Sequence, residues 1–190
     1  MIIIGITGTL GSGKGTIVKY LIRKREYTHF SVREFLLKEI KKRNLPENRD
    51  SMVMVANKLR KQNSPSYITD QLYEQSLKHN KDAIIESIRT PGEVESLRIK
   101  GEFYLFAVDA DPRIRYERIK LRNSETDQID FDTFIANEER EMTTIDPNKQ
   151  NLKKCLEMAD FVLLNNGSRD DLFQEVEKVL VQININNSSR

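Results

Sequence analysis

The stretch GITGTLGSGKGT, residues 5–16, holds the residues whose types and spacing most clearly suggest chemistry. It follows an apolar run, MIII, and precedes a segment with helical spacing. Glycines allow backbone N–H groups to wrap a phosphate, because no side chain blocks the turn. A helix that begins near Lys14 points the positive end of its dipole at the same place. This composition predicts a loop that holds a polyphosphate.

The spacing of the loop nearly fits the phosphate-loop pattern G-x-x-x-x-G-K-[ST]. The one departure is that Gly15 follows the lysine, so that the hydroxyl of Thr16 comes one residue later. Lys14 supplies a mobile positive charge for the outer phosphates. A glycine-rich turn without a ligand is the alternative, but the preceding strand, the spacing, the lysine and the hydroxyl all favour nucleotide binding. The predicted binding residues are Gly8, Gly11, Ser12, Gly13, Lys14, Gly15 and Thr16.

Short β-branched runs alternate with helical segments along the rest of the chain. The runs are MIIIGIT, DAIIES, EFYLFAVDA, ADFVLLNN and the weaker YTHFS. This alternation predicts an α/β fold, with a five-stranded parallel sheet between helices on both faces. Continuous apolar strands fit burial on both sides of the sheet. Helices are expected over 14–25, 31–43, 50–62, 65–79, 112–122, 131–142 and 169–181.

The composition argues against several classes of protein, among them nucleic-acid binders, zinc proteins and membrane proteins. A chain of 190 residues predicts one domain, and 31 basic against 29 acidic residues argue against a dedicated nucleic-acid binder. The one cysteine, Cys155, cannot form an internal disulfide, and no Cys/His spacing suggests a zinc site. The N-terminal apolar run is too short for a signal peptide or a membrane span. We therefore expect a cytoplasmic protein without membrane contact.

The segment GTLGSGKGT resembles the P-loop of the adenylate-kinase-type nucleoside monophosphate kinases, in which Gly-Thr also follows the lysine. The resemblance implies a three-layer P-loop NTPase fold, ATP and Mg²⁺ as cofactors, and transfer of the ATP γ-phosphoryl to a small phosphorylated acceptor. In that family the threonine of this Gly-Thr pair contacts phosphate and the magnesium shell. Thr16 is the matching residue in this sequence. The implied organisation is a single kinase domain over 1–185, with acceptor-side helices at about 32–80, a short lid at about 119–135 and a flexible tail at 186–190.

A second part of the resemblance lies in ESIRTPGEVESLR, residues 86–98. It is similar to the adenylate kinase segment Asp-Gly-Phe-Pro-Arg-Thr, although one residue is missing and glutamate replaces aspartate. In that family the arginine grips the acceptor's phosphate, which implies this role for Arg89. Glu86 ends the preceding strand and is a candidate for holding magnesium through water or for orienting the acceptor. A surface ion pair is the plain alternative for Arg89.

Arginines recur in RYERIKLR, where Arg115, Arg118 and Arg122 share one helix face. Arg118 and Arg122 resemble the Arg-x-x-x-Arg that borders the lid of nucleotide kinases. Such arginines stabilise the charge that spreads over a transferring phosphoryl group. Arg140 is the candidate beyond the lid, and pairing with Glu138 or a neighbouring glutamate is equally open. A solvated basic helix face is the alternative for the whole group.

Two weaker matches complete the comparison. The segment LLNNG, 163–167, ends the last strand where the family's adenine-binding loop lies, so that Asn165 and above all Asn166 are candidates for contact with the base. A plain turn fits equally well. In HFSVREFL, Ser31 is expected to cap a helix, and a role of Glu34 in the acceptor site stays open.

Other functions stay open from the sequence. Dephospho-CoA kinases are also similar, in IGITG, GSGK and FAVDADPRIRYERIKLR. Against them stand Gly15 after the lysine and the arginine of ESIRT, which favours an acceptor phosphate. A third interpretation is an adenylate-kinase-like ATPase that acts as a switch on a macromolecular partner. The base and sugar of the acceptor and the oligomeric state are not specified by the sequence.

Overall fold

A computed structural model describes residues 1–122 and 129–188. Its centre is a five-stranded sheet in the order β2-β3-β1-β4-β5, and every neighbouring pair is parallel. The strands are β1 (Ile2–Gly8), β2 (Thr28–Ser31), β3 (Ala83–Glu86), β4 (Glu102–Asp109) and β5 (Phe161–Leu164). The predicted α/β fold is thereby confirmed, and all five predicted runs form strands.

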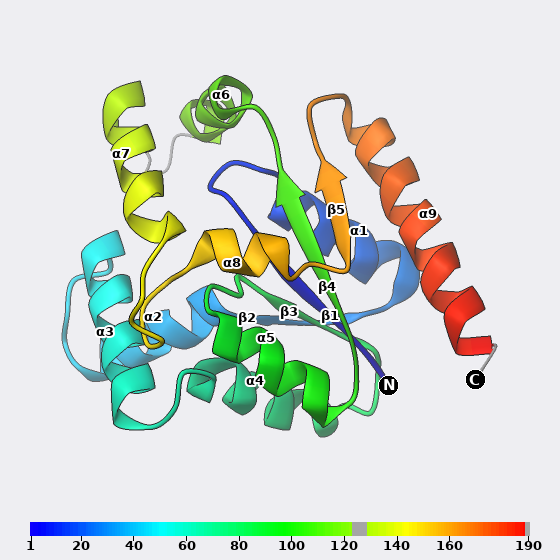
Figure 1. Cartoon of the computed structure of the whole chain (residues 1–190), viewed down its shortest axis with the longest axis horizontal. Coiled ribbons are helices and arrows are strands. Elements are labelled where there is room, and N and C mark those ends of the chain that lie inside the picture. The colour runs from blue at the N-terminus through cyan, green and yellow to red at the C-terminus, as the bar shows by residue number, and fades with distance from the viewer. Residues whose placement is uncertain (123–128, 189–190) are drawn as a thin grey trace.

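Helices cover both faces of the sheet (Figure 1). They are α1 (Lys14–Arg25), α2 (Val32–Lys42), α3 (Arg49–Gln62), α4 (Tyr67–Leu77), α5 (Pro91–Lys100), α6 (Pro112–Arg122), α7 (Phe131–Met142), α8 (Leu152–Glu157) and α9 (Arg169–Ser188). Each strand of a parallel sheet needs such a crossover to return to the same edge, and a helix supplies it. The carboxyl ends of the strands therefore meet at one edge.

The core divides into two apolar clusters, one on each face of the sheet. Ile3 faces the cluster shared with α2, α3, α4, α5 and α8, whereas Ile4 faces the cluster shared with α1 and α9. Successive strand residues point to opposite faces, so the run MIII supplies both layers. This explains why the strands are apolar without alternation. The result is a rigid three-layer body that fixes the loops at its carboxyl edge.

Several helices begin at side chains that the sequence indicates. Ser31 caps α2 by accepting a hydrogen bond from the Glu34 backbone, as expected. Asp111 accepts a hydrogen bond from the Arg113 backbone, and Pro112 begins α6. Thr90 and Glu93 form a complete capping box at α5. These caps orient helices that leave the carboxyl edge of the sheet.

The C-terminal end differs from the prediction. Helix α9 continues to Ser188, past the expected helix end and through most of the segment expected to be a flexible tail. Residues 189–190 of that tail, and residues 123–128 of the expected lid, lie outside the described residues. In the described ranges, no helix combines the length and apolar character that a membrane span requires.

Candidate active site

The loop between β1 and α1 has the backbone of a phosphate cradle. Gly8, Gly11 and Gly13 have φ values of 141°, 79° and 106°. A Cβ at Gly13 would lie 2.3 Å from Asn165 Nδ2, and a Cβ at Gly8 would lie 2.1 Å from a backbone oxygen of β4. These three glycines are therefore required by the turn. Gly15 differs, because a Cβ there would meet nothing within 4 Å.

Lys14 folds back over the loop that precedes it. Its Nζ donates hydrogen bonds to the carbonyl oxygens of Gly8 at 2.9 Å and Thr9 at 2.7 Å. Burial, reinforced by the nearby positive charge of Arg89, lowers the pKa of Lys14 to about 7. A bound polyphosphate would supply the negative charge that this buried amine lacks. The residues of the loop thus fit the phosphates of a nucleotide.

The loop after β5 locks against the cradle through Asn165. Its side-chain Nδ2 donates to the backbone carbonyl oxygen of Ser12 at 2.8 Å. Its backbone N–H donates to the backbone carbonyl oxygen of Asp109 at 2.8 Å. Ser12 is fully buried, and its Oγ has no partner among the described residues. Asn165 therefore holds the cradle in place, a role that the sequence analysis did not assign to it. Its neighbour Asn166 is exposed and accepts a hydrogen bond from the Asp111 backbone instead.

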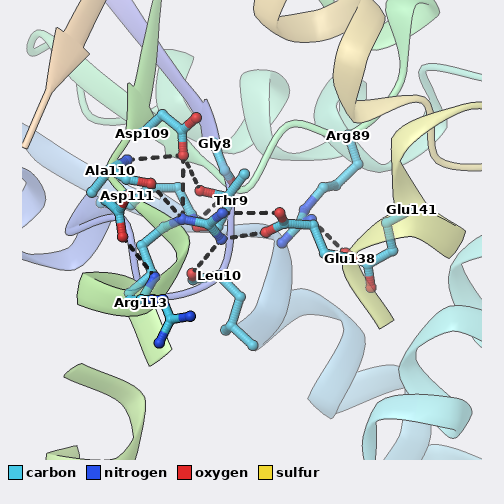
Figure 2. Close-up of polar contacts among 12 residues, drawn as sticks. Gly8, Thr9, Leu10, Arg89, Asp109, Ala110, Asp111, Arg113, Glu138 and Glu141 are labelled. Atoms are coloured by element: carbon cyan, nitrogen blue, oxygen red, sulfur yellow. Dashed lines mark hydrogen bonds and ion pairs between the residues drawn. The ribbon is translucent and has the colours of Figure 1, made fainter. Parts of the chain in front are cut away.

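Arg115 is a structural residue that links the phosphate cradle to α7. Its guanidinium is buried and donates to the carbonyl oxygens of Leu10 and Ala110 and to the carboxylate of Glu138 (Figure 2). It also lies 3.4 Å from Asp109. Of the three arginines expected on one face of α6, this one joins the cradle to α7. It does not line the cavity described below.

A cavity of about 710 Å³ runs from the cradle to the helices that follow β2. Arg118 and Arg122 line it from α6. Arg118 donates weakly to Asn165 Oδ1 at 3.4 Å, its Nη1 has no partner in the described part of the chain, and burial lowers its pKa. Both arginines therefore lie where the sequence analysis placed them. Arg140 does not, because it is exposed on α7, bonds to Asn137 and is not part of the cavity wall.

Arg89 lines the cavity just before the start of α5, and its guanidinium already donates to a carboxylate. Glu141 on α7 accepts a hydrogen bond from Arg89 at 2.8 Å (Figure 2). It also accepts one from Arg49 at 2.6 Å. Burial alone would raise the pKa of Glu141, but the two arginines outweigh it and hold that pKa below its usual range. The arginines thus form a site that holds an oxyanion.

Glu86 stands between the two ends of the cavity at the end of β3. Its Oε2 lies 3.3 Å from His29 Nε2 on the neighbouring strand β2. Burial alone would raise the pKa of Glu86, but His29 and Lys14 outweigh that effect and lower it. The carboxyl group is therefore ionised at neutral pH.

The donor set suits magnesium held mainly by a nucleotide. Thr16 and Glu86 both line the cavity. Within residues 1–122 and 129–188, no three His, Cys, Asp or Glu side chains gather into a metal cage. Magnesium bound to a nucleotide takes most of its oxygen ligands from phosphates and water, so one hydroxyl and one carboxylate are a fitting protein contribution.

The roles of four residues of the site were not predicted from the sequence: Arg49, Glu141, Arg60 and Glu93. They meet only in the folded chain, because α3, α5 and α7 are far apart in sequence. Each is a charged residue in a helix that is rich in charge, so spacing alone does not distinguish it. Asn165 and Arg115 were seen in the sequence, but their structural roles were not.

The comparisons with known proteins agree with this geometry. A family model described as "AAA domain" matches residues 4–146. The UPF0200 protein MMP1282 of Methanococcus maripaludis is 31% identical over 190 residues, which cover 98% of this chain and 100% of that protein.

Two solved structures have a similar fold at low sequence identity. A gluconokinase from Sinorhizobium meliloti 1021 has a TM-score of 0.61 at 13% identity, covering 98% of this chain and 97% of its own. A shikimate kinase from Bacteroides thetaiotaomicron has a TM-score of 0.60 at 12% identity, and the match covers 96% of this chain and 98% of that one.

These neighbours show a P-loop kinase-like fold, while the adenylate kinase type in particular stays a prediction. The relation to MMP1282 extends over nearly the whole of both chains, and the domain model covers the cradle, strands β2, β3 and β4, most of β1, and α7. The chain therefore belongs to the UPF0200 family and is built on an AAA-type P-loop domain.

Proposed function

We propose that this protein is a phosphotransferase that moves the γ-phosphoryl group of ATP to a phosphate oxygen of a nucleoside monophosphate or a similar small phosphorylated acceptor. The observation that carries the proposal is one cavity with two anion sites. A glycine cradle lies at one end, and Arg49 and Arg89 hold a carboxylate at the other. Two phosphate-bearing ligands that share a cavity can be placed in line for transfer.

The residues of the chain divide the work by position. Backbone N–H groups from Gly11 to Thr16 bind the β-phosphate, and Lys14 turns from its two carbonyl partners to the β and γ oxygens. Arg118 and Arg122 neutralise charge on the transferring group from α6. Thr16 and Glu86 would hold magnesium, which supplies further neutralisation of the phosphates when bound.

The acceptor is held by arginine. Its phosphate would replace the Glu141 carboxylate on Arg89 and Arg49, since all three groups lie along the cavity wall. An oxygen of that phosphate then attacks the γ-phosphorus, the bond to the β–γ bridging oxygen breaks, and ADP leaves. The planar fork of arginine suits a phosphate that must keep one orientation.

The test is ADP formation from ATP and Mg²⁺ with a panel of acceptors. The panel contains the ribonucleoside and deoxyribonucleoside monophosphates, dephospho-CoA, shikimate, gluconate and a sample without acceptor. We expect turnover with a monophosphate. Turnover only with an unphosphorylated acceptor, or turnover that needs no acceptor, would refute the proposal, the latter in favour of an ATPase switch.

The matched variants are Lys14→Ala and Lys24→Ala. Lys14 lies in the cradle, whereas Lys24 is exposed near the end of the same helix and outside the cavity. Lys14→Ala should abolish transfer and keep the fold, as measured by circular dichroism, while Lys24→Ala should keep both. Wild-type turnover in Lys14→Ala would show that the cradle does not bind the transferred phosphates.

A further inference from the structure

One guanidinium in the cavity wall is held rigidly but has an unused nitrogen. Arg60, on α3, has a side chain that is 1% exposed. Its Nε and Nη2 donate to Glu93 Oε1 at 3.2 and 2.8 Å, while its Nη1 has no partner among the described residues. A buried donor without a partner costs free energy, and Arg60 lines the cavity, so a ligand that reaches this nitrogen from the cavity would satisfy it.

Glu93 fixes the orientation of this guanidinium. It is fully buried, and its second oxygen accepts from the backbone N–H groups of Arg89 and Thr90. The carboxylate is thus held by the start of α5, and the arginine is held by the carboxylate. Because the ion pair has no net charge, the free N–H groups of Nη1 favour a neutral oxygen over a second anion.

Helix α3 lies along the cavity from the phosphate site to Arg60. Arg49, Met52, Val53, Ala56 and Arg60 all line the cavity, and their spacing puts them on one helix face. Eleven residues at the helical rise separate the two arginines by about 16 Å along the axis. A bare phosphate on Arg49 would leave this length unfilled.

The wall between the arginines is apolar. Met52, Val53 and Ala56 line it from α3, and Val32 and Leu36 line it from α2. Gln150 also lines the cavity, and its buried Oε1 likewise lacks a partner in the described ranges. A flat group with apolar faces and a polar edge fits such a wall, since it can meet both the donor and the acceptor.

We infer that Arg60, oriented by Glu93, determines which acceptor binds, and that the acceptor is a nucleotide whose base has a carbonyl oxygen at its edge. A guanidinium N–H donates well to a base carbonyl, whereas the exocyclic amine of adenine would place a donor against a donor. This inference rests on the proposed function. It adds a substrate class and a specificity residue to it.

The experiment uses substrates that differ in one group. AMP and IMP share ribose, phosphate and ring, but AMP has an amine where IMP has a carbonyl. The values of kcat/KM for IMP, GMP, CMP and UMP are measured against AMP with the full chain. We expect at least one carbonyl base to exceed AMP about tenfold. A preference for AMP over all four would overturn the inference.

The variant Arg60→Lys keeps a positive charge beside Glu93 and removes the second nitrogen of the fork. We expect the preference over AMP to fall about tenfold, with the KM for ATP unchanged. The control Arg43→Lys alters an ion-paired arginine that is only partly buried and lies outside the cavity. A lower melting temperature with an unchanged base preference would show that Arg60 is only structural, and would refute the inference.

Binding separates failure of the inference from failure of the proposed function. If no acceptor is phosphorylated, the same monophosphates are tested by calorimetry. Selective binding of carbonyl bases without transfer would overturn the proposed function and keep the role of Arg60. Absence of binding by every monophosphate would overturn both. Transfer that favours AMP would overturn the inference alone.

Discussion

Backbone groups form one end of the cavity, whereas charged side chains form the other. The end that we assign to ATP, the donor end, comes from one continuous stretch, residues 8–16, whose backbone forms the cradle. The acceptor end comes from side chains of α3, α5 and α7 and of the loop before α5, which pair as Arg49 and Arg89 with Glu141 and as Arg60 with Glu93. A site made of backbone depends on local glycines, while a site made of side chains depends on the fold. Substitutions should therefore act through conformation at the first end and through charge at the second.

The largest effect is expected from Gly13→Ala. A new Cβ would meet Asn165 Nδ2 in a left-handed backbone position. We expect the free energy of unfolding to fall by about 3 kcal/mol, measured by urea denaturation, together with weaker ATP binding.

Gly15→Ala is the matched control at the same end. A Cβ at Gly15 would meet nothing within 4 Å, and the residue lies inside α1. The substitution should therefore raise the free energy of unfolding by about 1 kcal/mol at most, because alanine favours the helix over glycine. Equal losses of stability in both variants would contradict a cradle defined by positive φ angles.

Arg89→Ala tests charge at the acceptor end. Loss of a charge-assisted hydrogen bond should raise the KM for the acceptor about 10- to 100-fold, while the KM for ATP changes little. Steady-state kinetics with each substrate varied in turn measures this. Arg98→Ala, a surface arginine of α5 paired with Asp160, is the control. If Arg89→Ala changed only the KM for ATP, the acceptor assignment would be wrong.

Glu141→Gln tests the charge at the acceptor end from the opposite side, with a smaller expected effect on the KM for the acceptor. The carboxylate occupies the arginines that we assign to the acceptor's phosphate. Removing its charge and keeping its shape should lower the KM for the acceptor by a factor of about 3, the scale of a partly exposed ion pair. An increase in that KM would show instead that Glu141 positions the arginines for binding.

The smallest effect concerns the proton on Lys14. Because the pKa of the unliganded amine is about 7, the amine is mostly neutral above that pH, and bound phosphates favour its charged form. ATP binding at pH 8 should therefore take up a proton, and the affinity should fall as pH rises from 7 to 9. Calorimetry in buffers of different ionisation enthalpy measures the uptake. Lys14→Arg, which is always charged, should show none; equal uptake in both would contradict this origin.

The sequence predicted the fold well for a physical reason. Apolar runs such as MIII and EFYLFAVDA specify buried strands by their length and residue types, and they became β1 and β4. The cradle was equally visible, since Gly8, Gly11 and Gly13 take φ angles that other residues avoid.

The acceptor end was visible only in part. Arg89 was predicted from the resemblance of residues 86–98 to an adenylate kinase segment, but its partner Glu141 is 52 residues away and reaches it only through the path of α7. Arg140 was the candidate beyond the lid, with pairing to a neighbouring glutamate left open. The helix turns Arg140 outward, and the adjacent Glu141 lines the cavity. One step along a helix rotates a side chain by about 100°, and the sequence did not specify that rotation.

Helix α7 contacts both ends through two carboxylates less than one turn apart. Glu138 holds Arg115, which touches Leu10 of the cradle, and Glu141 holds the arginines of the acceptor end. An acceptor that displaces Glu141 would disturb the helix that also supports the cradle. We therefore expect the two ligands to bind cooperatively. Thermodynamic reciprocity then requires that the acceptor change the affinity for nucleotide by the same factor as the nucleotide changes the affinity for acceptor.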